Sequence, residues 1–324
     1  MSVPQRFTEG SRILVSGGAG FLPSHVVDRL IDRGATVVVV DNFITGAKAN
    51  LAHLDGNPRF AMIEGDVSDG LPPGVDGQRF DAIMHLASPA SPTDFAKLGI
   101  EIMRVNALGT LHLLERAAAD GARFLLASTS EAYGDPLVHP QPETYWGNVN
   151  PIGVRSVYDE SKRFAEAATM AYHRDRGTDV AILRIFNTYG PRMALDDGRA
   201  IPTYISQALR GESLTVMGTG DQTRSICYVD DLVRGMLLLL DSTEVGPVNC
   251  GTEHEITMRD LATMIISLTG SRSEMVFLPR SPDDPEKRRP DLTRARTLLG
   301  YEPVVPAEDG LRRTIDYFAR HLGQ

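Results

Sequence analysis

The sequence predicts an α/β protein built on a doubly wound parallel sheet with a smaller C-terminal α/β lobe, and two observations support this prediction. Short apolar stretches typical of buried strands alternate with amphipathic helical patterns along the first half of the chain. The first two apolar stretches, residues 12–16 and 36–40, flank one predicted helix over residues 21–31. A strand–helix–strand unit of about 30 residues favours a right-handed crossover between parallel strands.

The remaining elements follow from the same patterns. Further strands are expected at residues 59–63, 82–86, 123–127 and 180–185, and long helices at residues 100–120 and 155–176. Beyond Asn187 the elements are shorter, with helices expected at 201–210, 230–240, 258–268 and 310–321 and a strand at 214–217. We therefore expect residues 1–187 to form a first domain, to which a segment near residues 225–255 returns. Residues 188–324 are expected to form mainly a second, smaller lobe.

Composition and charge restrict the class of protein. The chain has 324 residues, of which 42% are hydrophobic and 23% charged, as in an ordinary globular protein. The formal net charge is −9 and the basic residues are scattered, which argues against nucleic acid as a partner. No apolar run reaches membrane-spanning length, and the first eleven residues lack an apolar signal core, so no membrane partner is expected. Cys227 and Cys250 lie far apart, which predicts neither a metal site nor a disulfide framework and fits a cytoplasmic location.

A glycine turn between the first strand and the first helix predicts a dinucleotide site. Gly17 and Gly20 belong to this turn, and the helix N-terminus after them offers backbone N–H groups to a pyrophosphate. Asp41 follows 21 residues after Gly20, where a carboxylate binds the ribose hydroxyls and repels a 2′-phosphate. These features predict a Rossmann-type domain that binds NAD rather than NADP, the alternative being a glycine loop in some other α/β protein. Pro23 replaces the third glycine of the usual pattern, and we expect it to weaken cofactor binding.

Tyr158 and Lys162 form a candidate proton-transfer pair. Their four-residue spacing places both side chains on one face of the predicted helix 155–176. A free phenol has a pKa of about 10, and a lysine cation one turn away is expected to lower it. The pair would then act as a base that takes a proton from a hydroxyl while hydride leaves the same carbon. A chance Y-x-x-x-K on an amphipathic helix is the alternative, and the short motif alone does not exclude it.

Longer motifs along almost the whole chain decide between these interpretations. They are HLASPASP at 85–92, ASTSEAYGDP at 127–136, YWGNVNPIG at 145–153, RIFNTYGPRM at 184–193, DGR at 197–199, QTR at 222–224 and DPEKRRPD at 284–291. With these motifs the chain resembles the extended short-chain dehydrogenase/reductases, the family of nucleotide-sugar epimerases, dehydratases and decarboxylases. Within that family it is most similar to the decarboxylases that act on UDP-glucuronic acid.

The resemblance implies a reaction and a set of site residues. The reaction is NAD-dependent oxidative decarboxylation of UDP-glucuronic acid through a UDP-4-keto-pentose to UDP-xylose, with the enolate stabilised electrostatically by Arg288. The implied catalytic residues are Thr129, Ser130, Glu131, Tyr158, Lys162 and Arg288. The implied cofactor-binding residues are Gly17, Gly20, Phe21, Leu22, Asp41, Asn42, Thr45, Gly46, Asp66, Val67, Leu86, Ser88, Tyr158, Lys162 and Thr188. The implied residues for the UDP-sugar are Pro89, Arg104, Tyr145, Asn187, Arg192, Arg199, Arg224 and Arg288. A homodimer joined through the two long helices is implied as well.

Two alternatives remain beside this activity. Related dehydratases resemble this chain but carry an Asp-Glu pair after the threonine, and epimerases usually lack the glutamate, so Ser130, Glu131 and Arg288 favour decarboxylation over UDP-glucuronate 4-epimerisation or dehydration. A catalytically silent NAD-binding scaffold is an alternative of another class. Phe95 stands where many relatives carry a tyrosine; together with Pro23 it predicts that some 4-keto-pentose is released beside UDP-xylose.

Overall fold

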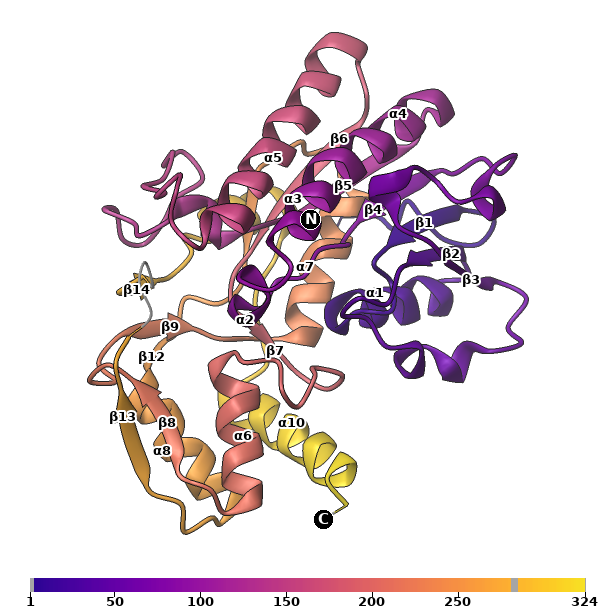
Figure 1. Cartoon of the computed structure of the whole chain (residues 1–324). Helices are drawn as coiled ribbons and strands as arrows, with labels where there is room; N and C mark the ends of the chain where they lie inside the picture. The colour runs from indigo at the N-terminus through magenta and orange to yellow at the C-terminus, as the bar shows by residue number, and fades with distance from the viewer. Residues whose placement is uncertain (1–2, 281–284, 324) are drawn as a thin grey trace.

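A seven-stranded parallel sheet forms the centre of the first lobe (Figure 1). The computed structural model describes residues 3–280 and 285–323. The strands are β1 Arg12–Ser16, β2 Thr36–Asp41, β3 Phe60–Glu64, β4 Ala82–His85, β5 Arg123–Thr129, β6 Val180–Ile185 and β11 Val248–Cys250. Their order is β11-β6-β5-β4-β1-β2-β3, so the chain runs outward from β1 in one direction and then from β4 in the other. This reversal confirms the doubly wound sheet, and the crevice at its switch point is where such sheets bind ligands.

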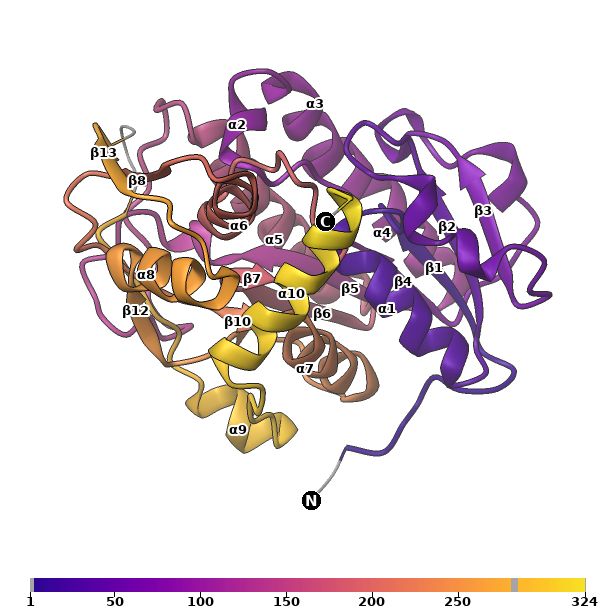
Figure 2. The ribbon, with the colours of Figure 1, turned by 90° about the horizontal axis from the view of Figure 1, so that it is seen from below.

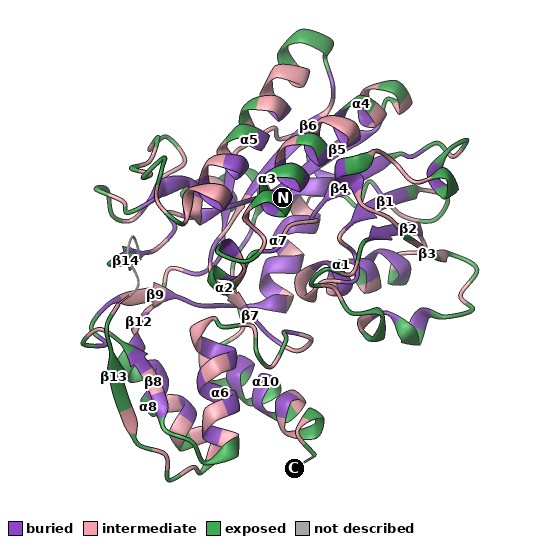
Figure 3. Ribbon diagram, in the orientation of Figure 1, coloured by how far each residue is buried: buried purple, intermediate pink, exposed green. Residues whose placement is uncertain are grey.

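Helices cover both faces of this sheet because the strand residues alternate between two apolar cores. Ile13 and Val15 belong to the core beneath α1 (Phe21–Asp32) and α7 (Val229–Asp241), whereas Leu14 belongs to the core beneath α4 (Thr110–Asp120) and α5 (Ser156–Arg176). Figure 2 shows α1 and α7 on one side of the strands and α4 on the other, and Figure 3 shows the strands buried between them.

The expected single helix over residues 100–120 is wrong. The chain forms α3 (Gly99–Arg104), a π-helical turn η5 (Val105–Gly109) and α4. In this turn the buried Asn106 amide donates to the hydroxyls of Ser88, at 3.1 Å, and Ser161, at 3.0 Å. The wider turn therefore accompanies a side-chain bridge between the β4 loop and α5, and single π turns often occur beside functional sites.

The second lobe contains three longer helices and short ribbons. Its helices are α6 (Ala200–Arg210), α8 (Met258–Thr269) and α10 (Ala307–His321), with shorter α9 (Thr293–Leu299) and, before the lobe, α2 (Pro92–Phe95). Its ribbons pair β8 (Leu214–Met217) with β13 (Met275–Leu278), β7 (Thr188–Tyr189) with β10 (Cys227–Tyr228), and β9 (Thr223–Ser225) with both β12 (Glu255–Thr257) and β14 (Lys287–Arg288). The 3₁₀ turns of the described residues belong instead to the first lobe: η1 Lys48–Asn50, η2 Ala52–Leu54, η3 Val67–Asp69, η4 Pro73–Val75 and η6 Ser130–Tyr133.

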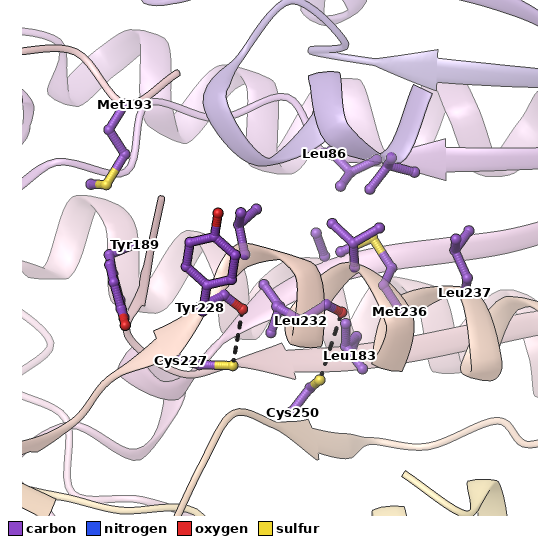
Figure 4. Close-up of a cluster of buried hydrophobic side chains, with 14 of the residues drawn as sticks. Leu86, Leu183, Tyr189, Met193, Cys227, Tyr228, Leu232, Met236, Leu237 and Cys250 are labelled. Carbon is purple, nitrogen blue, oxygen red and sulfur yellow. Dashed lines mark hydrogen bonds between the residues drawn. The ribbon is translucent and has the colours of Figure 1, made fainter. Parts of the chain in front are cut away.

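Both cysteines lie in the apolar core that joins the two lobes (Figure 4). Cys227 and Cys250 are free thiols, and burial raises the pKa of each. The Cys250 thiol donates to the carbonyl of Leu232 on α7 at 3.9 Å. The thiols therefore pack as small apolar side chains. Within residues 3–280 and 285–323, no helix is both long and apolar enough to cross a membrane.

Candidate active site

A cavity of about 730 Å³ opens at the carboxyl ends of the sheet strands. It is lined by the segments that follow β1, β2, β4, β5 and β6, together with residues at the start of α5 and near the end of α10. Most residues expected at the site line it: Gly17, Gly20, Phe21, Leu22, Asp41, Asn42, Thr45, Gly46, Asp66, Val67, Leu86, Ser88, Pro89, Thr129, Ser130, Tyr158, Lys162, Asn187, Thr188, Arg192 and Arg199.

The other expected residues, Arg104, Glu131, Tyr145, Arg224 and Arg288, do not belong to this lining. Arg104 is half exposed and pairs with Asp69 at 2.6 Å. The Tyr145 hydroxyl accepts a hydrogen bond from the Leu137 amide at 3.0 Å. Arg224 lies on β9 and donates to the Thr223 carbonyl at 2.8 Å. Asp284, the first residue of one of the quoted motifs, lies outside the described residues.

The part of the cavity lined by the turn between β1 and α1 fits a dinucleotide. Gly17 has φ +73°, and a Cβ there would lie 2.5 Å from the Ala87 Cα, so the turn requires glycine. Asp41 accepts hydrogen bonds from the backbone amides of Ala19, at 2.9 Å, and Phe43, at 2.8 Å. Burial raises the pKa of Asp41, and these two amides oppose the change. Each carboxylate oxygen keeps a lone pair for a ribose hydroxyl.

Pro23 lies in the first turn of α1, where it is buried and contributes to the cavity wall. The helical hydrogen bonds begin with the Ser24 amide, which donates to the Gly20 carbonyl at 3.1 Å. The missing N–H of Pro23 therefore removes no bond from the helix. It does remove one donor from the helix end that faces the cavity.

Tyr158 and Lys162 lie one turn apart on α5, as expected, and are almost completely buried. The Lys162 ammonium donates to the Ala127 carbonyl at 2.9 Å and lies 5.8 Å from the centre of the Tyr158 ring. The expected lowering of the Tyr158 pKa is wrong for this structure. Burial raises it well above 10, and a hydrogen bond with Thr129 only partly opposes burial. Burial also lowers the pKa of Lys162 to about 7.

Glu131 is held between two arginines behind the cavity wall. Arg288 donates to both carboxylate oxygens, in one case at 2.9 Å, and Arg155 donates to Oε2 at 2.6 Å. Burial opposes ionisation of Glu131, but the two guanidinium groups more than offset it and lower its pKa to about 2. Because the neighbouring Ser130 lines the cavity, this cluster of Glu131, Arg155 and Arg288 adjoins the cavity wall.

The sequence reasoning missed Arg155 and considered Phe95 only as a substitution for tyrosine, without predicting its contact with Tyr158. Phe95 stacks on the Tyr158 ring, with ring centres 5.1 Å apart and planes inclined by 16°. Arg155 connects Phe95 to the glutamate cluster, since its guanidinium lies 5.4 Å from the Phe95 ring centre. Arg155 lies three residues before Tyr158, and helical spacing could have placed it on the same side of α5.

Two arginines expected to bind substrate line the cavity and are already paired. Arg199 forms a two-pronged pair with Asp197, at 2.5 and 2.7 Å. Arg192 has φ 69°, which is unusual for a residue with a side chain, and pairs with Asp28 of α1 at 2.8 Å. Arg192 thus pairs with a residue of the first lobe and also lines the cavity.

The fold and the site together define a Rossmann-type protein with a dinucleotide cavity and a buried Tyr–Lys pair. The model of the NAD dependent epimerase/dehydratase family matches residues 13–251, and the chain belongs to this family. It is 51% identical to UDP-glucuronic acid decarboxylase 2 of Arabidopsis thaliana, covering 97% of this chain and 69% of the relative. It is 52% identical to UDP-glucuronic acid decarboxylase 1 of Danio rerio, covering 96% and 73%. A solved UDP-glucuronic acid 4-epimerase of Bacillus cereus, in complex with UDP-glucuronic acid and NAD, superposes with a TM-score of 0.85 at 30% identity, covering 96% of this chain and 99% of the other.

Proposed function

We propose that this protein is a UDP-glucuronic acid decarboxylase that uses NAD and forms UDP-xylose. The observation that supports this activity most is the clamping of Glu131 by Arg288, next to a cavity that also contains Tyr158. The sequence identity of 51% and 52% to the two UDP-glucuronic acid decarboxylases, over nearly the whole chain, agrees with this activity. The solved 4-epimerase is only 30% identical.

Tyr158 is the proposed base for oxidation of the hydroxyl on carbon 4. Thr129 hydrogen-bonds the phenol and orients it, while Lys162 anchors the site through the Ala127 carbonyl. Bound NAD supplies the hydride acceptor, held by the glycine turn and Asp41. Asp41 lines the cavity, and in this assignment its charge would repel the 2′-phosphate of NADP.

The glutamate cluster is proposed to act in the second step. A ketone on carbon 4 is β to the sugar carboxylate, so carbon dioxide leaves once the ketone can accept the electron pair. A guanidinium is a poor proton donor, and we assign Arg288 to electrostatic stabilisation of the enolate rather than to proton donation. Glu131 holds Arg288 in place and, as a carboxylate, orients a water that reprotonates the carbon.

The UDP moiety is proposed to bind toward the second lobe. Arg199 and Arg192 line the cavity and supply charge for the diphosphate, with Asn187 as an amide donor. Pro89 contributes to the sugar side of the wall. The roles of Arg104, Tyr145 and Arg224 remain proposals for residues outside this wall.

Incubation with UDP-glucuronic acid and NAD tests the activity directly. We expect release of carbon dioxide and a UDP-pentose identified by NMR. Formation of UDP-galacturonic acid without carbon dioxide would identify a 4-epimerase, and binding of NAD without any turnover would identify a silent scaffold. Either result contradicts the proposal.

We also propose a homodimer in the cytoplasm. Apolar side chains are exposed along the outer side of α3, η5 and α5, where a second copy could cover them: Ile100, Met103, Leu108 and Phe164. Light scattering together with Phe164→Glu tests the dimer, because a buried charge should dissociate it. The two free buried thiols agree with a reducing compartment, and cell fractionation tests the location.

A further inference from the structure

Asp159 is a buried acid that the proposed mechanism does not use. It follows Tyr158 directly on α5 and is only 5% exposed. Its Oδ1 atom is enclosed and has no hydrogen-bond partner among residues 3–280 and 285–323. An enclosed carboxyl oxygen without a partner costs folding free energy, so this position calls for a physical explanation.

The position of Asp159 places it beside the glutamate cluster. Asp159 lies one helical turn after Arg155, whose guanidinium donates to Glu131 at 2.6 Å, and Glu131 in turn binds Arg288. The charges that act on Asp159 come from three elements: Glu131 on η6, Arg288 on β14, and Arg155 with Glu160 at the start of α5. Any charge on Asp159 therefore adds to the charge of the cluster.

Two protonation states of Asp159 are accessible near neutral pH. Burial and the negative charge of Glu131 raise the pKa of Asp159, the two arginines oppose these effects only in part, and the net result is a pKa of about 7. Glu131 itself remains ionised throughout this range, because its pKa is about 2. Between mildly acidic and mildly basic pH, protonation of Asp159 thus changes the charge of the cluster by one unit.

We infer that Asp159 is a positioning residue that determines, by gaining or losing one proton, how strongly the glutamate cluster attracts the carboxylate of the sugar. The inference rests on the proposed function, since UDP-glucuronic acid carries that carboxylate on the carbon next to the one whose hydroxyl Tyr158 deprotonates. A neutral Asp159 leaves more of the positive charge of Arg155 and Arg288 for the ligand. An ionised Asp159 cancels part of it. One unit charge several ångströms away, in the effective dielectric of a protein, changes a dissociation constant by about ten-fold.

The test compares UDP-glucuronic acid with UDP-glucose, which carries CH₂OH in place of the carboxylate. The full chain carries Tyr158→Phe, which suppresses turnover, and is saturated with NAD. Calorimetry then measures the dissociation constant of each nucleotide sugar from about pH 6 to about pH 8.5. We expect the dissociation constant of UDP-glucuronic acid to rise about ten-fold relative to that of UDP-glucose. Lys162 also titrates within this range, and Asp159→Asn, which keeps Lys162, separates the effect of Asp159 from that of the lysine.

Two further variants, each combined with Tyr158→Phe, assign this pH dependence. Asp159→Asn keeps the shape of the neutral acid, and the ratio should stay at its low-pH value throughout. Glu160→Gln removes the next acid along the helix, which is partly exposed and pairs with Arg163 at 3.5 Å, and the pH dependence should persist.

Each failure has a distinct signature. A constant ratio in the parent overturns the inference even if Asp159→Asn does not fold, and so does a pH dependence that survives in Asp159→Asn. Binding of neither nucleotide sugar overturns the proposed function and this inference with it.

Discussion

Removal of the Arg155 side chain should destabilise the protein because Glu131 would lose one of its two cationic partners. The pKa of Glu131 is lowered from 4.5 to about 2. This difference corresponds to about 3 kcal/mol of stabilisation at neutral pH, at about 1.4 kcal/mol per pKa unit. Arg155 makes one of the three hydrogen bonds to the carboxylate, alongside two from Arg288. We therefore assign to Arg155 a third to a half of this stabilisation of about 3 kcal/mol. Its cation over the Phe95 ring adds about 0.5–1 kcal/mol. Arg155→Ala should thus lower the free energy of unfolding by about 2 kcal/mol.

Urea unfolding at several pH values measures this loss and its origin. The folded-state pKa of Glu131 lies below its unfolded value, so its stabilisation is complete above about pH 4.5 and disappears as the pH falls toward about 2. The difference between Arg155→Ala and the parent should therefore shrink as the pH is lowered through this range.

Arg312→Ala is the matched control for this measurement. Arg312 pairs with Glu308 at a similar distance, 2.6 Å, but both side chains are 56% exposed, so we expect a loss of no more than about 0.5 kcal/mol. Equal losses in the two variants, or a loss in Arg155→Ala that does not change with pH, would refute the reasoning.

Three further predictions concern the reaction. Tyr158→Phe should keep the stacking on Phe95 but reduce carbon dioxide release by about 10² to 10⁴-fold, and near-normal release would rule out Tyr158 as the base. Asp41→Ala should weaken NADH binding by about ten-fold or more in fluorescence titration, through the loss of charge-assisted hydrogen bonds, and should remove the preference over NADPH; equal or tighter NADPH binding in the parent would contradict this assignment. NMR of the products with excess NAD should show some UDP-4-keto-pentose beside UDP-xylose, and Pro23→Gly or Phe95→Tyr should reduce its share several-fold, since one neutral hydrogen bond is worth about 0.5–1.5 kcal/mol. UDP-xylose alone, with no NADH accumulating and no change in Pro23→Gly, would contradict the role of these two residues.

The sequence predicted the sheet well because its signals are local. Apolar runs, glycine turns and helical periodicity depend on neighbouring residues, and β2 and β6 begin where these patterns begin. The π turn η5 depends on distant partners instead. Asn106 binds Ser88 and Ser161, which lie 18 and 55 residues away in the chain. No periodicity within residues 100–120 contains that information.

The same distinction separates the correct and incorrect expectations for the site. The spacing of Tyr158 and Lys162 placed both on one face of α5, but the sequence did not show how completely their side chains are buried. Burial dominates both pKa values, and Phe95 stacks on the Tyr158 ring, so a lysine one turn away does not lower the pKa of the phenol. Likewise, Arg288 reaches Glu131 across 157 residues through the β9–β14 ribbon, and only the family motif indicated its role.

The start of α5 joins two groups of residues that are stabilised by different forces. Tyr158 is held by stacking on Phe95 and by Thr129, in surroundings that disfavour charge. Glu131 is held by paired charges that remain ionised across the neutral range. Loss of the phenol hydroxyl in Tyr158→Phe should therefore slow oxidation by the same factor of about 10² to 10⁴ and leave the pairs around Glu131 intact. This separation is why carboxylate binding can be measured in that variant, and why a change in the binding ratio there reports on the charged cluster rather than on the base.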